Sequence, residues 1–257
     1  MPALDTPAYA LVGSGYWSER MAAILQSMGR HCIPVKGVRQ LAGEDADPYV
    51  ARLADRFATT GASAAWLCVP PGDHVASIVR AALAGGLHVV AEKPWLVDAS
   101  TTRDLSAAAA AAGRLVAVHF EYCLLAEVVE WREVHRGGDG LAFGGEFVVS
   151  RSVRQRGPAA HNLGSHLFAI RRYAVGAAEV TSVSTSYLGP PSRRAWLDDH
   201  ERRLATADFT NNDEPVIQRF VVLAEDAMNS VASRCPFGLD FAAAVARDVE
   251  SYALLST

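Results

Sequence analysis

Short apolar runs alternate with longer segments of helical periodicity between residues 9 and 119 of this chain. The runs at 9–12, 31–38, 64–69, 87–91 and 115–119 predict strands, and the segments 17–28, 48–58, 73–84 and 100–112 predict helices. Strands that are apolar throughout and separated by single helices are typical of a parallel sheet covered on both faces. Because crossovers between parallel strands are right-handed, this part of the chain is expected to form a doubly wound α/β domain.

The pattern changes after residue 140, where strand-like segments cluster. The predicted strands are 145–153 and 180–188, with a hairpin made of 203–210 and 216–223, and the predicted helices are 126–136, 163–174 and 241–255. Clustered strands with few helices indicate an antiparallel sheet in an α+β domain. We therefore predict two domains, over residues 1–122 and 123–257.

The charge balance argues against nucleic acid as a partner. The chain has 24 Lys and Arg against 28 Asp and Glu, a net charge of −4, whereas neutralising phosphates requires a basic surplus. A local basic cluster at 151–156 could hold an anion, although a solvated face explains it more simply.

The cysteines and the apolar segments indicate in which cellular compartment the protein is expected. Cys32, Cys68, Cys123 and Cys235 have neither metal-ligand nor disulfide spacing. The N-terminus lacks the basic region and long apolar stretch of a signal peptide. The alanine-rich run at 107–112 is too short to cross a bilayer. We therefore expect a cytoplasmic protein with no membrane partner.

The turn after the first predicted strand carries two glycines, in Val12-Gly13-Ser14-Gly15-Tyr16-Trp17-Ser18. Gly13 permits a tight strand-to-helix turn, and Gly15 lets a pyrophosphate approach the backbone. The following helix directs its free N–H groups and the positive end of its dipole at that anion. Ser18 replaces the third glycine of the usual fingerprint with another small residue. A purely structural turn is the alternative, but the position between a strand and a helix favours a dinucleotide site in a Rossmann domain.

Cofactor choice depends on the end of the second predicted strand, where Val38, Arg39 and Gln40 stand. A site specific for NAD usually offers a carboxylate there to hold the ribose hydroxyls. An arginine can instead bind a 2′-phosphate through charge-assisted hydrogen bonds and stack on adenine. Arg39 therefore favours NADP, and NAD is the alternative if Glu44 or Asp45 holds the ribose.

Three further segments complete a family pattern: Val69-Pro70-Pro71-Gly72-Asp73-His74, Ala91-Glu92-Lys93-Pro94 and Asn162-Leu163-Gly164-Ser165-His166. With the glycine loop, they resemble the glucose–fructose oxidoreductase/inositol dehydrogenase (Gfo/Idh/MocA) family, from the N-terminal domain to about His166. The resemblance implies an NAD(P)-dependent oxidoreductase whose C-terminal domain binds substrate and has an open antiparallel sheet. That sheet commonly supports oligomer contacts, so a homo-oligomer, either a dimer or a tetramer, is expected. The residues expected at the cofactor are Gly13, Ser14, Gly15, Tyr16, Trp17, Arg39, Val69, Pro70, Pro71, His74, Glu92, Lys93 and Pro94.

The resemblance also implies that Lys93 lies at the nicotinamide and substrate end of the cleft and that His166 faces it from the second domain. Hydride transfer at a carbinol carbon requires a proton to move on oxygen, and an imidazole suits that role near neutral pH. A lysine ammonium beside the same oxygen can stabilise a developing alkoxide. In isolation, a solvated lysine and an ordinary helix histidine would be the simpler interpretations. His161 is five residues from His166, whereas a two-histidine metal site prefers four, so no metal is expected.

The chain departs from the family pattern at two positions. Asn162 stands where the family usually has an aspartate, four residues before the helix histidine; it can orient a substrate hydroxyl but cannot accept a proton. After the fifth strand, Phe120-Glu121-Tyr122-Cys123 replaces a frequent Asn/Tyr-Arg pair, so Tyr122 remains as a candidate active-site hydroxyl and Cys123 takes the arginine position. The chain is also shorter than most members, which suggests a trimmed C-terminal domain.

Three functions follow as hypotheses. The first is an NADP(H)-dependent dehydrogenase or reductase acting on a hydroxyl or keto carbon of a small sugar, polyol or sugar-derived metabolite. The second is a C=N reductase in a biosynthetic pathway. The third is a catalytically silent NADP-binding protein. Lys93 and His166 favour the first two hypotheses, which are enzymes. Asn162 and Cys123 favour the second and third hypotheses.

Overall fold

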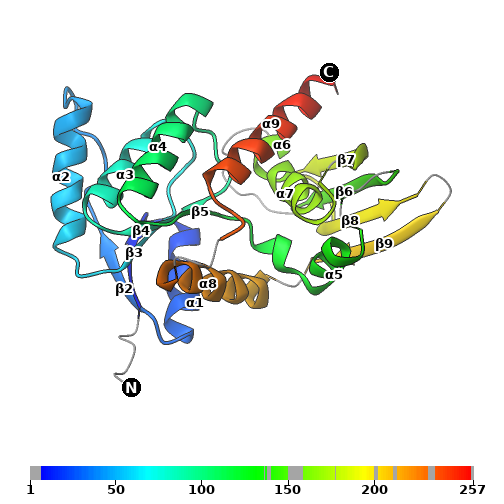
Figure 1. The fold of residues 1–257 in the computed structure, drawn as a ribbon, viewed down its shortest axis with the longest axis horizontal. Coiled ribbons are helices and arrows are strands. Elements are labelled where there is room, and N and C mark those ends of the chain that lie inside the picture. Colours follow the sequence, from blue (N-terminus) through cyan, green and yellow to red (C-terminus); the bar gives the residue numbers. More distant parts are fainter. Residues whose placement is uncertain are drawn as a thin grey trace. The chain divides into compact units, whose positions relative to one another are not determined.

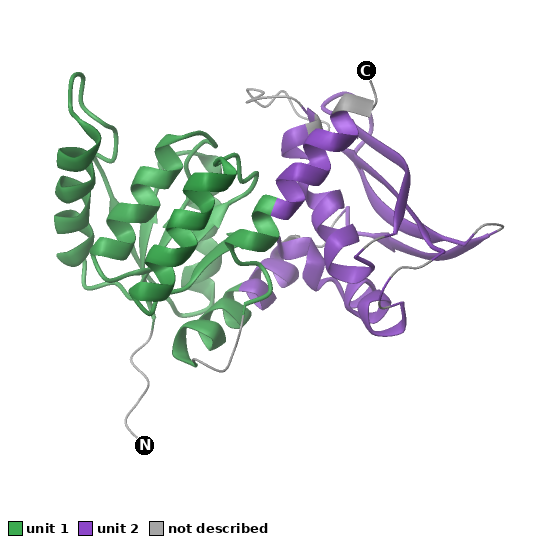
Figure 2. Ribbon diagram, turned by 45° about the horizontal axis from the view of Figure 1, so that its top comes forward, with its two compact units in different colours: residues 1–119, 221–243 green, residues 120–220, 244–257 purple. Residues whose placement is uncertain are grey.

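The computed structural model describes residues 7–135, 137, 140–149, 159–176, 178–199, 202–210, 213–230 and 235–255. The chain divides into two compact units (Figure 2). The first contains residues 1–119 and 221–243, and the second contains residues 120–220 and 244–257. Residues 221–243, which the sequence analysis placed in the C-terminal domain, are therefore part of the first unit. The basic cluster at 151–156 lies outside the described residues.

A five-stranded parallel sheet forms the centre of the first unit, in the order β2-β1-β3-β4-β5. Its strands are β1 (Ala8–Val12), β2 (His31–Val35), β3 (Ala64–Leu67), β4 (His88–Glu92) and β5 (Val116–His119). Its helices are α1 (Tyr16–Ser27), α2 (Ala46–Ala58), α3 (His74–Ala84), α4 (Ala99–Ala111) and the part of α8 (Asp213–Asn229) from Val221 onward. Figure 1 shows α2, α3 and α4 on one face of the sheet and α1 and α8 on the other. The predicted doubly wound α/β fold is confirmed.

Burial explains why these strands pair as they do. All four residues of β3 are buried, as expected for an inner strand covered on both faces. The four residues of β5 are buried as well, although this strand lies at the edge opposite β2, where Ala117 forms an isolated bridge with Gly238. At the edge, β2 is more exposed and contains Pro34, which an edge strand tolerates because one side of its backbone needs no partner. None of the described helices is both long and apolar enough to cross a membrane.

The second unit contains a four-stranded sheet in the order β7-β6-β8-β9. The strands are β6 (Ala142–Val148), β7 (Glu179–Ser186), β8 (Ser192–Asp198) and β9 (Arg203–Asp208). The helical elements are η1 (Glu121–Leu124), α5 (Ala126–Val134), α6 (Ala159–Asn162), α7 (Gly164–Ala174) and most of α9 (Leu239–Leu255). Helix α7 lies so close to β6 that a Cβ added at Gly145 would come within 2.7 Å of the Leu167 side chain.

Three details of the second sheet differ from the prediction. The sheet is mixed, since β6 pairs with β8 antiparallel but with β7 in parallel, and α7 lies in the long crossover that a parallel pair requires. Strand β8 was not predicted. Residues 216–223 form part of α8 and not the second strand of a hairpin. Their buried positions, Val216, Ile217, Phe220, Val221 and then Ala224, follow a helical period.

A buried carboxylate holds α8 in the first unit. Glu225 Oε1 accepts hydrogen bonds from Tyr9 Oη at 2.9 Å and Arg30 Nε at 3.0 Å, and Oε2 accepts from Arg30 Nη2 at 2.6 Å. Burial and the charge of Glu225 raise the pKa of Tyr9, so its hydroxyl remains a donor. The contact joins β1, the residue before β2 and α8, which are far apart in sequence.

We expect Glu225→Gln to lower the free energy of unfolding by about 2 kcal/mol, because Arg30 would keep a partly buried charge without its counter-ion. The measurement is urea unfolding followed by circular dichroism. Glu214→Gln is the matched control, since Glu214 is exposed on the same helix and should change stability by less than about 0.5 kcal/mol. Equal stabilities of the two variants would contradict this role of Glu225.

Candidate functional site

The glycine loop between β1 and α1 contains two glycines with different surroundings. Gly13 has a φ of +132°, and an added Cβ would lie 2.4 Å from the carbonyl oxygen of Cys68. No heavy atom lies within 4 Å of a Cβ added at Gly15, so space is open beside that residue. Gly15 is also the N-cap of α1 and offers no side chain to the first N–H groups of the helix. The loop therefore has the close turn and the accessible helix N-terminus that a pyrophosphate requires.

Ser18 occupies the third position of the fingerprint and is buried. Its Oγ donates a hydrogen bond to the carbonyl oxygen of Gly13 at 3.1 Å. The serine thus fits where glycine is usual, and it ties the first turn of α1 to the glycine loop.

The loop lies where the order of the sheet reverses. From β1 the chain passes to β2 on one side, and it then crosses to β3 on the other side. Val12 is in register with Val35 of β2 and Leu67 of β3, so the carboxyl ends of these strands share one edge. Open α/β sheets bind their ligands at this position. The predicted cofactor residues that follow β3 and β4 lie at the same edge: Val69, Pro70, Pro71, His74, Glu92, Lys93 and Pro94.

A charged group is buried at the end of β4. Glu92 Oε1 accepts a hydrogen bond from Trp66 Nε1 at 2.9 Å and lies 3.1 Å from His119 Nδ1. Burial opposes ionisation of this carboxyl, yet its pKa is lowered because His119, Trp66 and Trp17 favour the carboxylate. The ring centroid of Trp17 lies 6.4 Å from that of His119, which connects the glycine loop to this cluster. Sequence reasoning did not identify Trp66 or His119; a histidine ending an apolar strand was the available signal.

Lys93 lies between two anchored segments. Glu92 precedes it, and the peptide bond from Lys93 to Pro94 is cis. Beyond Pro94, the buried Trp95 donates from Nε1 to Thr102 Oγ1 at 3.0 Å. These contacts fix the backbone on both sides of the lysine at the carboxyl edge of the sheet.

The second unit brings the predicted Tyr122 and His166 together. Their ring centroids are 4.7 Å apart in an edge-to-face arrangement, and Phe147 stacks on the imidazole at 5.1 Å. Arg193 Nη1 of β8 donates a hydrogen bond to Tyr122 Oη at 2.7 Å. Neither Phe147 nor Arg193 was predicted as a site residue. Asn162, at the end of α6, donates from Nδ2 to Tyr187 Oη at 2.9 Å.

Cys123, at the family's arginine position, is buried next to Tyr122 in sequence. Burial and the charge of Glu121 raise the pKa of its thiol well above the usual value. Cys123 is therefore a neutral core residue rather than a reactive thiolate. Within the described part of the chain, no three His, Cys, Asp or Glu side chains are grouped to hold a metal ion.

Comparison with protein families defines the class. Residues 8–120 match the model of the GFO_IDH_MocA family, described as an oxidoreductase family with an NAD-binding Rossmann fold. The protein is thus of the NAD(P)-dependent oxidoreductase class. Over these residues the chain matches the Gfo/Idh/MocA family, in agreement with the sequence resemblance.

Solved structures share the fold of both units at low sequence identity. The WlbA (WbpB) dehydrogenase of Thermus thermophilus, in complex with NAD and UDP-GlcNAcA, has a TM-score of 0.71 at 18% identity over 98% of this chain and 95% of its own. UDP-N-acetylglucosamine 3-dehydrogenase GnnA of Acidithiobacillus ferrooxidans has a TM-score of 0.71 at 12% identity, covering 95% of each chain. GenD2 from gentamicin A biosynthesis, in complex with NAD, has a TM-score of 0.72 at 16% identity over 96% of this chain and 93% of its own. No curated protein matches by sequence.

We expect Gly13→Ala to destabilise the protein by at least about 2 kcal/mol, since the new Cβ would overlap Cys68 and the backbone is left-handed. Gly15→Ala is the matched control and should change stability by less than about 0.5 kcal/mol, because its Cβ enters open space. Urea unfolding of both variants measures the difference. A fully stable Gly13→Ala protein would refute the close approach to Cys68.

Proposed function

We propose that the protein is an NADP(H)-dependent oxidoreductase that transfers hydride to or from a hydroxyl or keto carbon of a small sugar, polyol or sugar-derived metabolite. The observation that carries the proposal is the glycine loop at the switch point of the first sheet. The backbone at Gly13 packs tightly against Cys68, whereas the space beside Gly15 is open. A dinucleotide pyrophosphate needs this arrangement.

The residues of the first unit fit such a cofactor. The backbone from Gly13 to Trp17 and the start of α1 would hold the pyrophosphate. The exposed guanidinium of Arg39, in the loop after β2, would pair with a 2′-phosphate. The segments at 69–74 and 92–94 would line the nicotinamide end. When bound, the nicotinamide supplies or accepts the hydride.

Four side chains are candidates for the chemistry at the substrate oxygen. We assign to Lys93 the stabilisation of negative charge that develops on this oxygen, which an ammonium does well when water is excluded. His166 would accept or return the proton, and Tyr122, held by Arg193, would position the substrate. Asn162 would hydrogen-bond to a substrate hydroxyl, since an amide can orient such a group without taking its proton.

The substrate class is supported by the structural neighbours. Two of the three named above are a dehydrogenase in complex with UDP-GlcNAcA and a UDP-N-acetylglucosamine 3-dehydrogenase. Two of the three structures contain NAD, so the proposed preference for NADP depends on Arg39 of this chain and not on the relatives.

Tryptophan fluorescence is a suitable first test, because Trp17 lies in the glycine loop and Trp66 contacts Glu92. We expect NADPH to quench this fluorescence at lower concentration than NADH. Oxidation of NADPH is then followed with keto sugars, oxidised nucleotide sugars and cyclic imines. Turnover with a keto sugar supports the proposal, turnover with imines alone contradicts the proposed bond, and binding without any turnover indicates a silent protein.

We expect Lys93→Met to lower kcat by about 10²- to 10³-fold, the usual loss when one group stabilising the transition state is removed. Its dissociation constant for NADPH should stay within about threefold, because the pyrophosphate contacts are made elsewhere. Lys36→Met is the matched control: Lys36 is the only other lysine and follows β2, so kcat at saturating cofactor should not change. An unchanged kcat in Lys93→Met would exclude Lys93 from the mechanism.

A further inference from the structure

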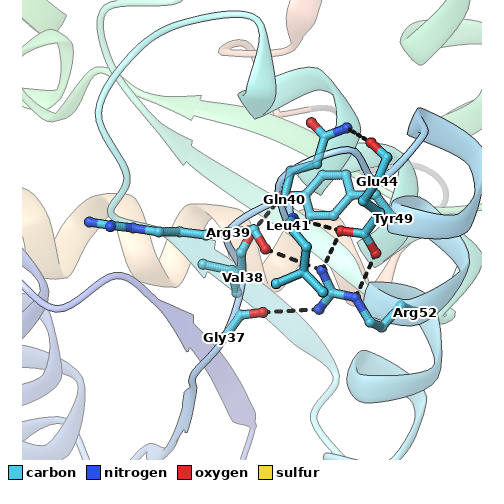
Figure 3. A network of polar contacts seen from close by, with 8 residues as sticks. All are labelled: Gly37, Val38, Arg39, Gln40, Leu41, Glu44, Tyr49 and Arg52. Carbon is cyan, nitrogen blue, oxygen red and sulfur yellow. Dashed lines mark hydrogen bonds and ion pairs between the residues drawn. The ribbon is translucent and has the colours of Figure 1, made fainter.

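The loop between β2 and α2, residues 36–45, is held against one face of α2 (Figure 3). Tyr49, Arg52 and Arg56 lie on this face, three and four residues apart. Their side chains donate to four consecutive backbone carbonyls: Arg56 Nη1 to Lys36 at 2.6 Å, Arg52 Nη1 to Gly37 at 3.2 Å, Tyr49 Oη to Val38 at 2.6 Å and Arg52 Nη2 to Arg39 at 3.1 Å. The course of the loop is therefore set by side chains of α2.

Arg52 also binds Glu44, one of the two acids of this loop. Its Nε lies 2.8 Å from Glu44 Oε1 and its Nη2 lies 2.8 Å from Glu44 Oε2, a bidentate pair. The backbone N–H of Leu41 donates to the same Oε2 at 2.8 Å. Gln40 Nε2 donates to the carbonyl oxygen of Glu44 at 2.6 Å. Arg52 thus joins Glu44 to the carbonyls of Gly37 and Arg39 in one network.

This network determines what Glu44 can do. The hydrogen bonds from Arg52 and from Leu41 lower the pKa of the Glu44 carboxyl to about 2, so it is ionised under all ordinary conditions. Both of its oxygens already accept hydrogen bonds, and its charge is balanced by the guanidinium. A ribose hydroxyl that is to bind the Glu44 carboxylate would have to displace these donors.

Arg39 is placed differently by the same contacts. Its carbonyl oxygen is bound by Arg52, whereas its side chain is exposed and extends away from the network (Figure 3). Because β1 and β2 are parallel neighbours, this loop leaves the sheet at the edge that also carries the glycine loop. The adenosine ribose of a dinucleotide lies at the end of the second strand in such folds.

We propose that Arg52, acting through Glu44, is a positioning residue that sets the cofactor selectivity of this protein. Arg52 neutralises the one glutamate of the loop, which would otherwise repel a 2′-phosphate and bind the ribose of NAD. It also fixes the backbone that presents Arg39 to that phosphate. This inference rests on the proposed function and adds to it the residues that determine the choice between NADP and NAD.

The test is the ratio of the dissociation constants for NADH and NADPH, measured by tryptophan quenching on the full chain. Arg39→Ala should weaken NADPH binding by about 10- to 100-fold, as expected for a lost charge-assisted contact, and change NADH binding by less than about threefold. Arg52→Ala should lower the ratio by about tenfold. Glu44→Gln combined with Arg52→Ala should recover part of that loss, because the unpaired carboxylate is gone.

Arg56→Ala is the matched control, since it removes a carbonyl contact from the same face of α2 without touching Glu44. Its ratio should remain within about threefold of the unmodified protein. Circular dichroism checks that each variant is folded, and Arg52→Lys, which keeps the charge but not the bidentate geometry, gives a second measurement if Arg52→Ala does not fold.

The outcomes separate the two proposals. A preference of the unmodified protein for NADPH together with an unchanged ratio in Arg52→Ala and Arg52→Lys would overturn this inference alone. Equal weakening of both cofactors without recovery in the double variant would also overturn it, because Arg52 would then be only structural. Binding of neither dinucleotide by the unmodified protein would contradict the proposed function itself.

Discussion

The pairing of β1 with a parallel strand on each side is the constraint on which the first unit depends. It brings the ends of β2 and β3 level with Val12, so the chain must turn into α1 directly beside Cys68. Only a residue without a side chain can make that turn, and Gly13 does so with a left-handed φ. The sheet therefore accounts for Gly13 completely. It does not require a glycine at position 15, where an added Cβ would meet nothing within 4 Å, so packing does not account for Gly15.

Two buried carboxylates show how this sheet accommodates charge. Glu225 is compensated by Arg30 and Tyr9 at the amino-terminal side of the strands, and it holds a helix from late in the sequence. Glu92 is compensated by Trp66 and His119 at the carboxyl edge. Removing a partner from such a group leaves a charge that cannot be solvated, so each carboxylate fixes the geometry of its surroundings. At the carboxyl edge that geometry includes the backbone of Lys93.

The sequence was most informative where one physical signal dominated. Fully apolar strands such as 64–67 can only be buried on both faces, and this predicted the first sheet and its helices. It misled where two signals competed: the β-branched and aromatic residues between Val216 and Leu223 suggested a strand, but burial at Val216, Phe220 and Ala224 follows a helix. Strand β8 was missed because Arg193 and Arg194 interrupt the apolar alternation, and the parallel pairing of β7 depends on a crossover that local pattern does not reveal.

The same distinction applies to the candidate site. Residues that act through the backbone, such as Gly13 and Gly15, are visible as motifs because their chemistry is local. The pairing of Glu44 with Arg52 is not visible, since the two lie eight positions apart across the start of a helix and either could equally be solvated. The contact of Arg193 with Tyr122 is likewise not visible in the sequence. The sequence shows a cysteine where the family often has an arginine, but the folded chain brings a guanidinium from β8 to the hydroxyl of Tyr122. A charge missing from a motif is therefore not necessarily missing from the space around it, and Cys123 is weaker evidence for lost catalysis than the sequence suggests.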